Sequence, residues 1–70
     1  MQLHINGDRR DFDSPLTLAN LVEHLGMKQD RVAVELNGNI IPRDQWSETN
    51  LSEGDRLEVV HFVGGGCRNN

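Results

Sequence analysis

The segment RLEVVHF, residues 56–62, decides the fold, and the chain continues from it into VGGG, residues 63–66. Leu57 and Val59 alternate onto one face, and the neighbouring valine and phenylalanine make the apolar run nearly continuous. Such a run is typical of a central strand that is covered on at least one side. The last strand of the chain is therefore expected in the middle of a sheet, with a glycine-rich end beyond it.

Two Asn-Gly pairs predict hairpins upstream of this strand. Asn6-Gly7 and Asn37-Gly38 each follow an alternating apolar segment, and both residues of such a pair tolerate the positive φ that tight hairpin turns require. Phe12 is expected as the inward anchor of the first return strand, and residues 53–55 form a further tight turn. The expected strands cover residues 2–5, about 9–13, 32–36, 40–41 and 56–62.

A helix is predicted between the two hairpins. Its apolar residues recur at helical spacing, at Leu18, Leu21, Val22 and Leu25. Thr17 is placed to cap the first free amides, and Gly26 ends the helix where a left-handed residue is usual. Residues 43–51 are expected to form one helical turn and a loop, with Trp46 folded onto the core. The predicted class is α+β, a ubiquitin-like β-grasp in which one main helix packs across a mixed four- to five-stranded sheet.

Composition excludes several classes of function. The chain has 70 residues, eleven acidic against seven basic, a net charge of −4 and one cysteine. A scattered positive charge is a poor match for nucleic acid, and one cysteine gives no internal disulfide and no zinc or iron–sulfur ligand set. No segment approaches the roughly 20 apolar residues that span a bilayer. We expect a soluble cytoplasmic protein with no metal site and no catalytic residues of its own.

Three segments together resemble the ThiS family, the sulfur carriers of thiamine biosynthesis. They are VELNG at residues 34–38, IPRDQW at residues 41–46, and EGD continuing through LEVVHFVGGG at residues 53–66. The resemblance covers residues 1–66. It implies a β-grasp protein whose terminal glycine carboxylate is adenylated by an E1-like enzyme of the ThiF type with ATP and is then converted to a thiocarboxylate.

The resemblance also implies the residues and partners of this chemistry. Gly66 would bear the reacting carboxylate, Gly65 precedes it, and Gly64 takes a position that is often small. Sulfur would come from a donor such as a cysteine desulfurase and pass to a thiazole synthase of the ThiG type, with no cofactor bound to the carrier itself. Glycine suits this role because it has no side chain to obstruct a narrow channel, and four extended residues reach about 13 Å.

The chain departs from the family pattern after Gly66, because Cys67-Arg68-Asn69-Asn70 follow. An amide at the Gly66–Cys67 bond cannot be adenylated. Our hypothesis is that a JAMM-type metalloprotease first removes residues 67–70, so that Gly66 and Cys67 form a processing site. Two alternatives are a cloning remnant and a thioester formed by attack of Cys67 on the preceding carbonyl. We place the domain at residues 1–63 and the tail at residues 64–70.

Residues just before the tail are candidates for partner contact. Val63 and Phe62 are apolar, and they either close the core or lie against the activating enzyme. Other functions stay open at this point: a carrier for molybdopterin, cysteine or a secondary metabolite, a ubiquitin-like modifier joined to lysines through Gly66, or a plain interaction module.

Overall fold

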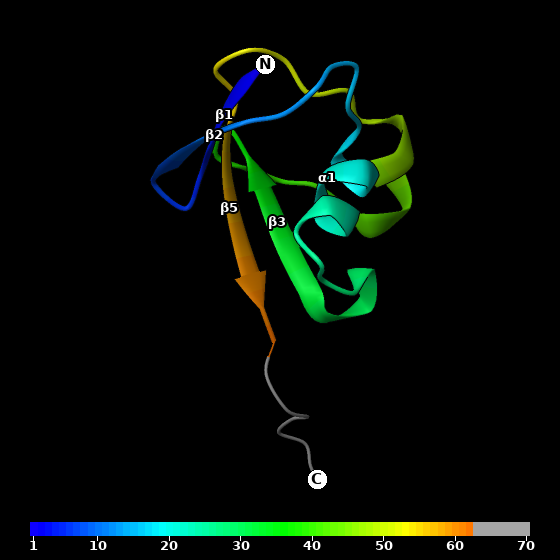
Figure 1. The fold of residues 1–70 in the computed structure, drawn as a ribbon. Helices are drawn as coiled ribbons and strands as arrows, with labels where there is room; N and C mark the ends of the chain where they lie inside the picture. Colours follow the sequence, from blue (N-terminus) through cyan, green and yellow to red (C-terminus); the bar gives the residue numbers. More distant parts are fainter. Residues whose placement is uncertain (63–70) are drawn as a thin grey trace, which may run out of the picture.

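The computed structural model describes residues 1–62 of the chain, and its architecture is a five-stranded mixed sheet with one helix packed across one face (Figure 1). The strand order is β2-β1-β5-β3-β4, so the last strand is central, parallel to β1 and antiparallel to β3. The elements are β1 Gln2–Ile5, β2 Asp8–Asp11, α1 Leu18–His24, η1 Gln29–Arg31, β3 Val32–Leu36, β4 Asn39–Ile40, η2 Arg43–Glu48 and β5 Arg56–His61. The predicted fold class and the central position of the last strand are confirmed.

Both Asn-Gly pairs form the predicted hairpin turns. Asn6 and Asn37 each have φ of 51°, and the glycine after each has φ of 87°. The first return strand is shorter than expected, because β2 ends at Asp11. Phe12 lies just beyond it and is only half-buried, although its N–H still donates to the Met1 carbonyl at 2.8 Å.

The main helix begins and ends as the sequence predicts. The Thr17 hydroxyl accepts a hydrogen bond from the Asn20 N–H at 3.1 Å, which caps the first turn. Gly26 follows the last turn with φ of 74°. Within residues 1–62 no helix has the length and apolarity needed to cross a membrane.

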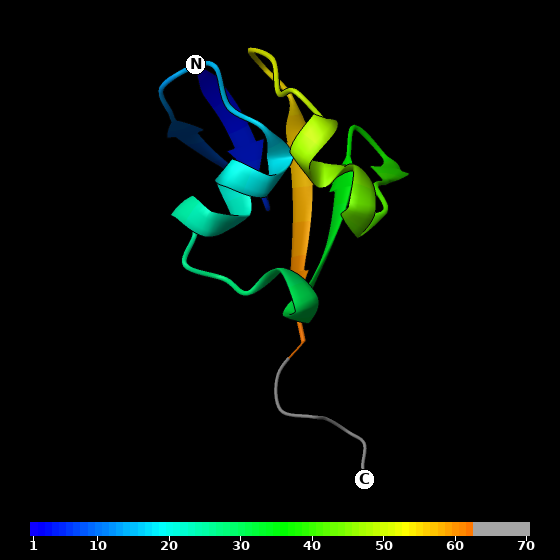
Figure 2. The ribbon, with the colours of Figure 1, turned by 90° about the vertical axis from the view of Figure 1, so that its right-hand side faces the viewer.

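A single core lies between the sheet and the helical layer formed by α1 and η2 (Figure 2). Its residues are Leu3, Ile5, Leu16, Leu18, Leu21, Val22, Val32, Val34, Trp46, Leu51, Leu57 and Val59. Trp46 folds onto the core as predicted and is only 2% exposed. Its indole Nε1 donates to the Ile41 carbonyl at 2.9 Å, so burial leaves the ring N–H paired.

Candidate functional site

The end of β5 is the part of the described structure that presents the glycine-rich segment. This strand pairs with β3 from Leu57, opposite Leu36, up to His61, opposite Val32. The Phe62 N–H then donates to the Arg31 carbonyl at 2.7 Å. Figure 1 shows that β5 ends at the opposite end of the molecule from the N-terminus. The body therefore holds the chain firmly in place up to Phe62, four residues before Gly66.

Most of the site residues predicted from sequence lie outside the described part of the structure. Gly64, Gly65, Gly66 and Cys67 belong to this group, and so does Val63. Their roles stay predictions.

Phe62 is described, and half of its side-chain surface is exposed. It does not close the core, so its apolar surface is available to a partner.

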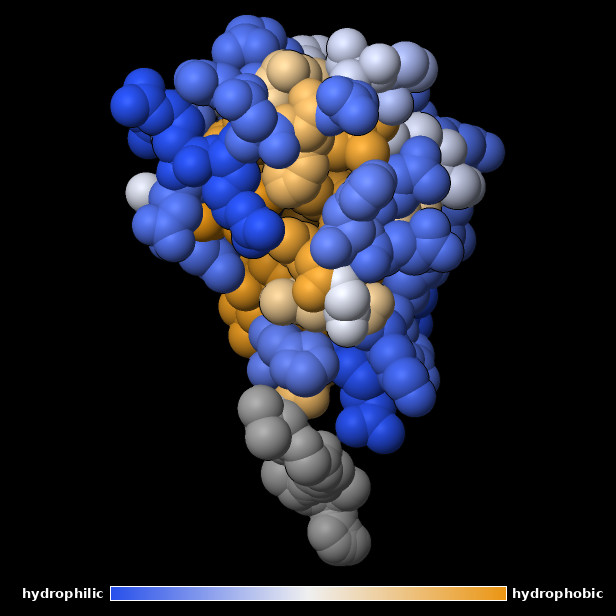
Figure 3. Space-filling view, viewed as in Figure 1, coloured by the Kyte–Doolittle hydropathy of each residue, from blue (hydrophilic) through white to orange (hydrophobic). Residues whose placement is uncertain are grey.

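Three large apolar residues are exposed on the outer face, which we define as the face of the sheet turned away from α1. They are Ile40, Val60 and Phe62, with 73%, 55% and 50% of their surface accessible. Ile40 and Val60 line a groove of about 70 Å³ together with Ala33 and side chains of β3 and β5. Figure 3 views the molecule from the side, with the sheet and α1 next to each other, and shows apolar surface between them that reaches toward the level at which β5 ends. This groove is far below the roughly 300 Å³ of a small-molecule pocket, so it suits contact with a protein surface.

Two carboxylates are placed directly opposite one another beside this apolar patch. Glu35 on β3 pairs in register with Glu58 on β5, and both side chains are exposed on the outer face. Like charges at directly opposed positions of a sheet are destabilising. A basic group from a partner would relieve that repulsion.

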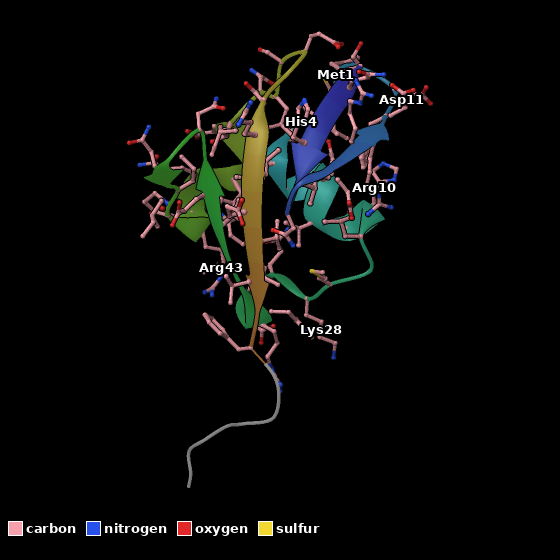
Figure 4. All side chains as sticks on the ribbon, turned by 90° about the vertical axis from the view of Figure 1, so that its left-hand side faces the viewer. Met1, His4, Arg10, Asp11, Lys28 and Arg43 are labelled. Carbon is pink, nitrogen blue, oxygen red and sulfur yellow. The ribbon has the colours of Figure 1, made fainter. Side chains whose placement is uncertain are left out.

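A basic row crosses the same face near the start of β5. His4 is the register partner of both Arg9 on β2 and Arg56 on β5. Figure 4 shows His4 beside the upper part of β5, away from the end of the strand. Along the outer face of β5 the side chains thus change from basic Arg56, beside His4, through Glu58 to the apolar Val60 and Phe62 near the exit of the chain, and this order would orient a docking partner.

The described residues form no preorganised reaction centre. Residues 1–62 contain no buried polar or charged side chain and no group of three possible metal ligands. A hollow of about 720 Å³ is open to solvent and is lined by residues that include Met1, Arg10 and Asp11. Figure 4 places Met1 and Asp11 toward the end of the molecule remote from the exit of β5, and Arg10 beside the middle of the body. The chemistry of this chain is therefore sought at its C-terminal end.

The family model described as "ThiS family" matches residues 3–66. The chain belongs to the ThiS family. The match begins in β1 and ends at Gly66, so the four residues from Cys67 to Asn70 lie outside it.

Relatives and solved structures agree with this membership. The chain is 41% identical over 66 residues to a thiazole synthase of Paramagnetospirillum magneticum. The matched region covers 94% of this chain but only 20% of that protein. It is 29% identical to the sulfur carrier protein ThiS of Escherichia coli over 94% of this chain and the whole of that protein. The crystal structure of the thiamine biosynthesis protein ThiS from Geobacter metallireducens superposes with a TM-score of 0.79 at 35% identity, covering 94% of this chain and all of that one.

Some features of the ThiS-type body were not found by sequence reasoning. The Asn6 side chain forms hydrogen bonds with β5, and the Asn37 side chain forms hydrogen bonds with the start of β5 and with the turn before it. The Asn-Gly pattern predicts the turns at these residues but does not predict these side-chain hydrogen bonds. Glu35 and Glu58 lie opposite each other because of the register between β3 and β5. The sequence pattern predicts the two strands but not the register in which they pair.

Proposed function

We propose that this chain carries sulfur as a thiocarboxylate on Gly66 and donates it for thiazole formation in thiamine biosynthesis. The observation that supports this most directly is that the ThiS family match ends at Gly66, five residues beyond the end of a strand anchored in the centre of the sheet. A folded body that ends in an unhindered glycine carboxylate needs no pocket of its own, because the partner enzymes enclose the reacting atoms.

The proposed chemistry takes place at one carboxylate. An oxygen of the Gly66 carboxylate attacks the α-phosphorus of ATP in an E1-like enzyme, and pyrophosphate leaves as the acyl–AMP anhydride forms. The outer sulfur of a protein persulfide, loaded by a donor such as a cysteine desulfurase, then attacks the acyl carbon and expels AMP, which gives an acyl disulfide. A second thiol of the partner proteins attacks the inner sulfur of that acyl disulfide, so that a protein disulfide forms and the thiocarboxylate leaves. The resulting thiocarboxylate passes its sulfur to thiazole synthase. Gly65 and Gly64 allow close approach because they lack a Cβ.

This scheme requires that Gly66 becomes a chain end, and we propose that residues 67–70 are removed by a protease of the JAMM type. Mass spectrometry of the protein from its native host tests this step. A dominant species ending at Gly66 is expected while the thiazole pathway is active. A dominant species that still ends at Asn70 under those conditions would contradict it.

Reconstitution with purified partners tests the function. The chain trimmed to Gly66 is incubated with the E1-like enzyme, ATP and a sulfur source, and its mass should rise by the difference between sulfur and oxygen. The untrimmed chain and a chain that ends at Gly65 are the matched controls. Absence of the mass shift in the Gly66 form, with an enzyme that charges its own carrier, would refute the proposal.

Isopeptide conjugates would indicate a protein modifier instead. In that case lysates should contain target lysines joined to Gly66, and the trimmed chain should give acyl–AMP without a stable thiocarboxylate. The location we propose is the cytoplasm, since the single cysteine fits a reducing compartment.

A further inference from the structure

Strand β5 is longer than the strand that flanks it on one side. Its parallel pairing with β1 ends at Ile5 opposite Leu57. Beyond that point the side chain of Asn6 replaces the strand: its Oδ1 accepts the Val59 N–H at 2.8 Å, and its Nδ2 donates to the Val59 carbonyl at 3.1 Å. The Asn6 amide therefore completes the hydrogen bonding of β5 on this side for one more residue and ends it there.

His61 is the next residue whose backbone faces the same side. On the β3 side, Phe62 bonds to Arg31 and Asn37 bonds to Arg56, so alternate positions of β5 point toward β3. His61 and Val32 form a non-hydrogen-bonded pair, so the N–H and C=O of His61 are directed away from β3. Neither group has a hydrogen-bond partner elsewhere in residues 1–62. Figure 4 shows β1 ending well above the lower end of β5. The structure thus leaves an open strand edge at His61.

Exposed apolar side chains flank this edge. Val60 and Phe62, the residues before and after His61, both lie on the outer face with half or more of their surface accessible. Addition of a strand to an exposed edge uses main-chain hydrogen bonds for affinity and alternate side chains for specificity. Residues 60–62 offer both features in one segment.

We propose that thiazole synthase pairs an extended segment of its own chain with the open edge of β5 at His61. This rests on the proposed function. Gly66 lies within about 13 Å of Phe62 when residues 63–66 are drawn out, so an enzyme that encloses Gly66 must bring its surface to the end of β5. The Paramagnetospirillum magneticum thiazole synthase contains a segment similar to this chain over a fifth of its own length. In that protein a segment similar to this chain belongs to the same polypeptide as the rest of the synthase. For this reason we assign the open edge to thiazole synthase.

The occupant has a defined chemistry. Its backbone supplies one carbonyl to the His61 N–H and one N–H to the His61 carbonyl, and its side chains on the outer-face side are apolar where they meet Val60 and Phe62. A basic side chain further along this surface would lie near Glu58, which is opposite Glu35 on the outer face.

A proline at His61 tests the edge selectively. His61→Pro removes the N–H that faces the open side, while the hydrogen bonds to β3 come from the neighbouring residues. His61→Ala removes the side chain and keeps the N–H, so it is the matched control. Binding of each variant, trimmed to Gly66, to the thiazole synthase of the same organism is measured by calorimetry. Thiocarboxylate formation by the activating enzyme is measured on the same samples.

We expect His61→Ala to bind within about twofold of the parent and His61→Pro to bind roughly tenfold more weakly, the scale of one hydrogen bond between protein groups. Thiocarboxylate formation should be equal in both. If His61→Pro lowers the melting temperature, a backbone ester at position 61 provides the same test without the ring, because it replaces the N–H by oxygen.

Equal binding of the proline or ester variant and the alanine variant would overturn the inference. Equal loss of synthase binding and thiocarboxylate formation would assign the edge to the activating enzyme and also overturn it. The same two measurements on the unsubstituted chain, trimmed to Gly66, show whether the proposed function itself is at fault. If the parent trimmed to Gly66 neither acquires sulfur nor binds the synthase, the function itself is wrong.

Discussion

Replacing Asn6 by alanine should destabilise the fold far more than its position in a surface turn implies. The substitution removes two hydrogen bonds to the Val59 backbone, at 2.8 and 3.1 Å, worth about 0.5–1.5 kcal/mol each. It also places a Cβ-bearing residue without a local hydrogen bond at φ of 51°, which costs about 1–2 kcal/mol. The total, about 2–5 kcal/mol, is a large part of the roughly 4–10 kcal/mol expected for a chain of this length.

Asn37 provides a matched control. It has the same φ of 51° and is also followed by a glycine at 87°, so the backbone cost of alanine is the same at both positions. Its side chain also makes two hydrogen bonds, to the Arg56 N–H at 3.0 Å and to an Asp55 carboxylate oxygen at 3.1 Å, but both are exposed whereas those of Asn6 are partly buried. Asn6→Ala should therefore cost about 1 kcal/mol more than Asn37→Ala.

Urea unfolding measures this difference. With a slope of about 1 kcal/mol per molar for a small domain, the two midpoints should be separated by roughly 1 M, with Asn6→Ala lower. Asn6→Gly keeps the turn geometry and removes only the side-chain bonds, so its midpoint should lie above that of Asn6→Ala. Equal midpoints for the two alanine variants would refute the conclusion that the Asn6 amide acts as part of the sheet.

Three further outcomes are expected. Trp46→Ala should lower the free energy of unfolding by about 3–5 kcal/mol. Trp46→Phe should lower it by about 1–3 kcal/mol, because phenylalanine leaves the Ile41 carbonyl without the donor that lies 2.9 Å away. Chemical denaturation measures both changes. Glu58→Gln should raise stability by about 0.2–1 kcal/mol by removing the repulsion with Glu35, and the gain measured from urea midpoints should shrink at high salt. Val63→Ala should weaken binding to the activating enzyme in a titration and leave the melting temperature almost unchanged; a large drop in melting temperature would show that Val63 closes the core instead.

The sequence predicts the body of this fold well because its signals are local. The Asn-Gly pairs require positive φ and occur at hairpin turns, Thr17 and Gly26 bound the helix by capping chemistry, and the apolar run of β5 matches a central strand. The first return strand was predicted too long, since alternation alone does not show where pairing ends.

The features that concern partners depend on contacts between distant segments and are not readable from local pattern. The bond from Asn6 to Val59 joins residues 53 positions apart in sequence. The free backbone of His61 follows from the register of β5 against both neighbours, and a shift of one residue would direct these groups toward β3. The apolar run of β5 indicated burial, yet Val60 and Phe62 are exposed, because burial on a two-sided strand depends on which face the helix covers.

The shortness of the open edge is physically consistent with its proposed use. A long exposed edge beside apolar side chains would pair with other copies of the chain and aggregate. Asn6 limits the exposure by completing the hydrogen bonding of β5 as far as Val59, so His61 is the only residue of β5 in the described structure that leaves both backbone groups unpaired on that side. One residue of edge is too little for stable self-association through backbone pairing. It is sufficient for an enzyme that also holds the segment leading to Gly66, because the two contacts then add within one complex.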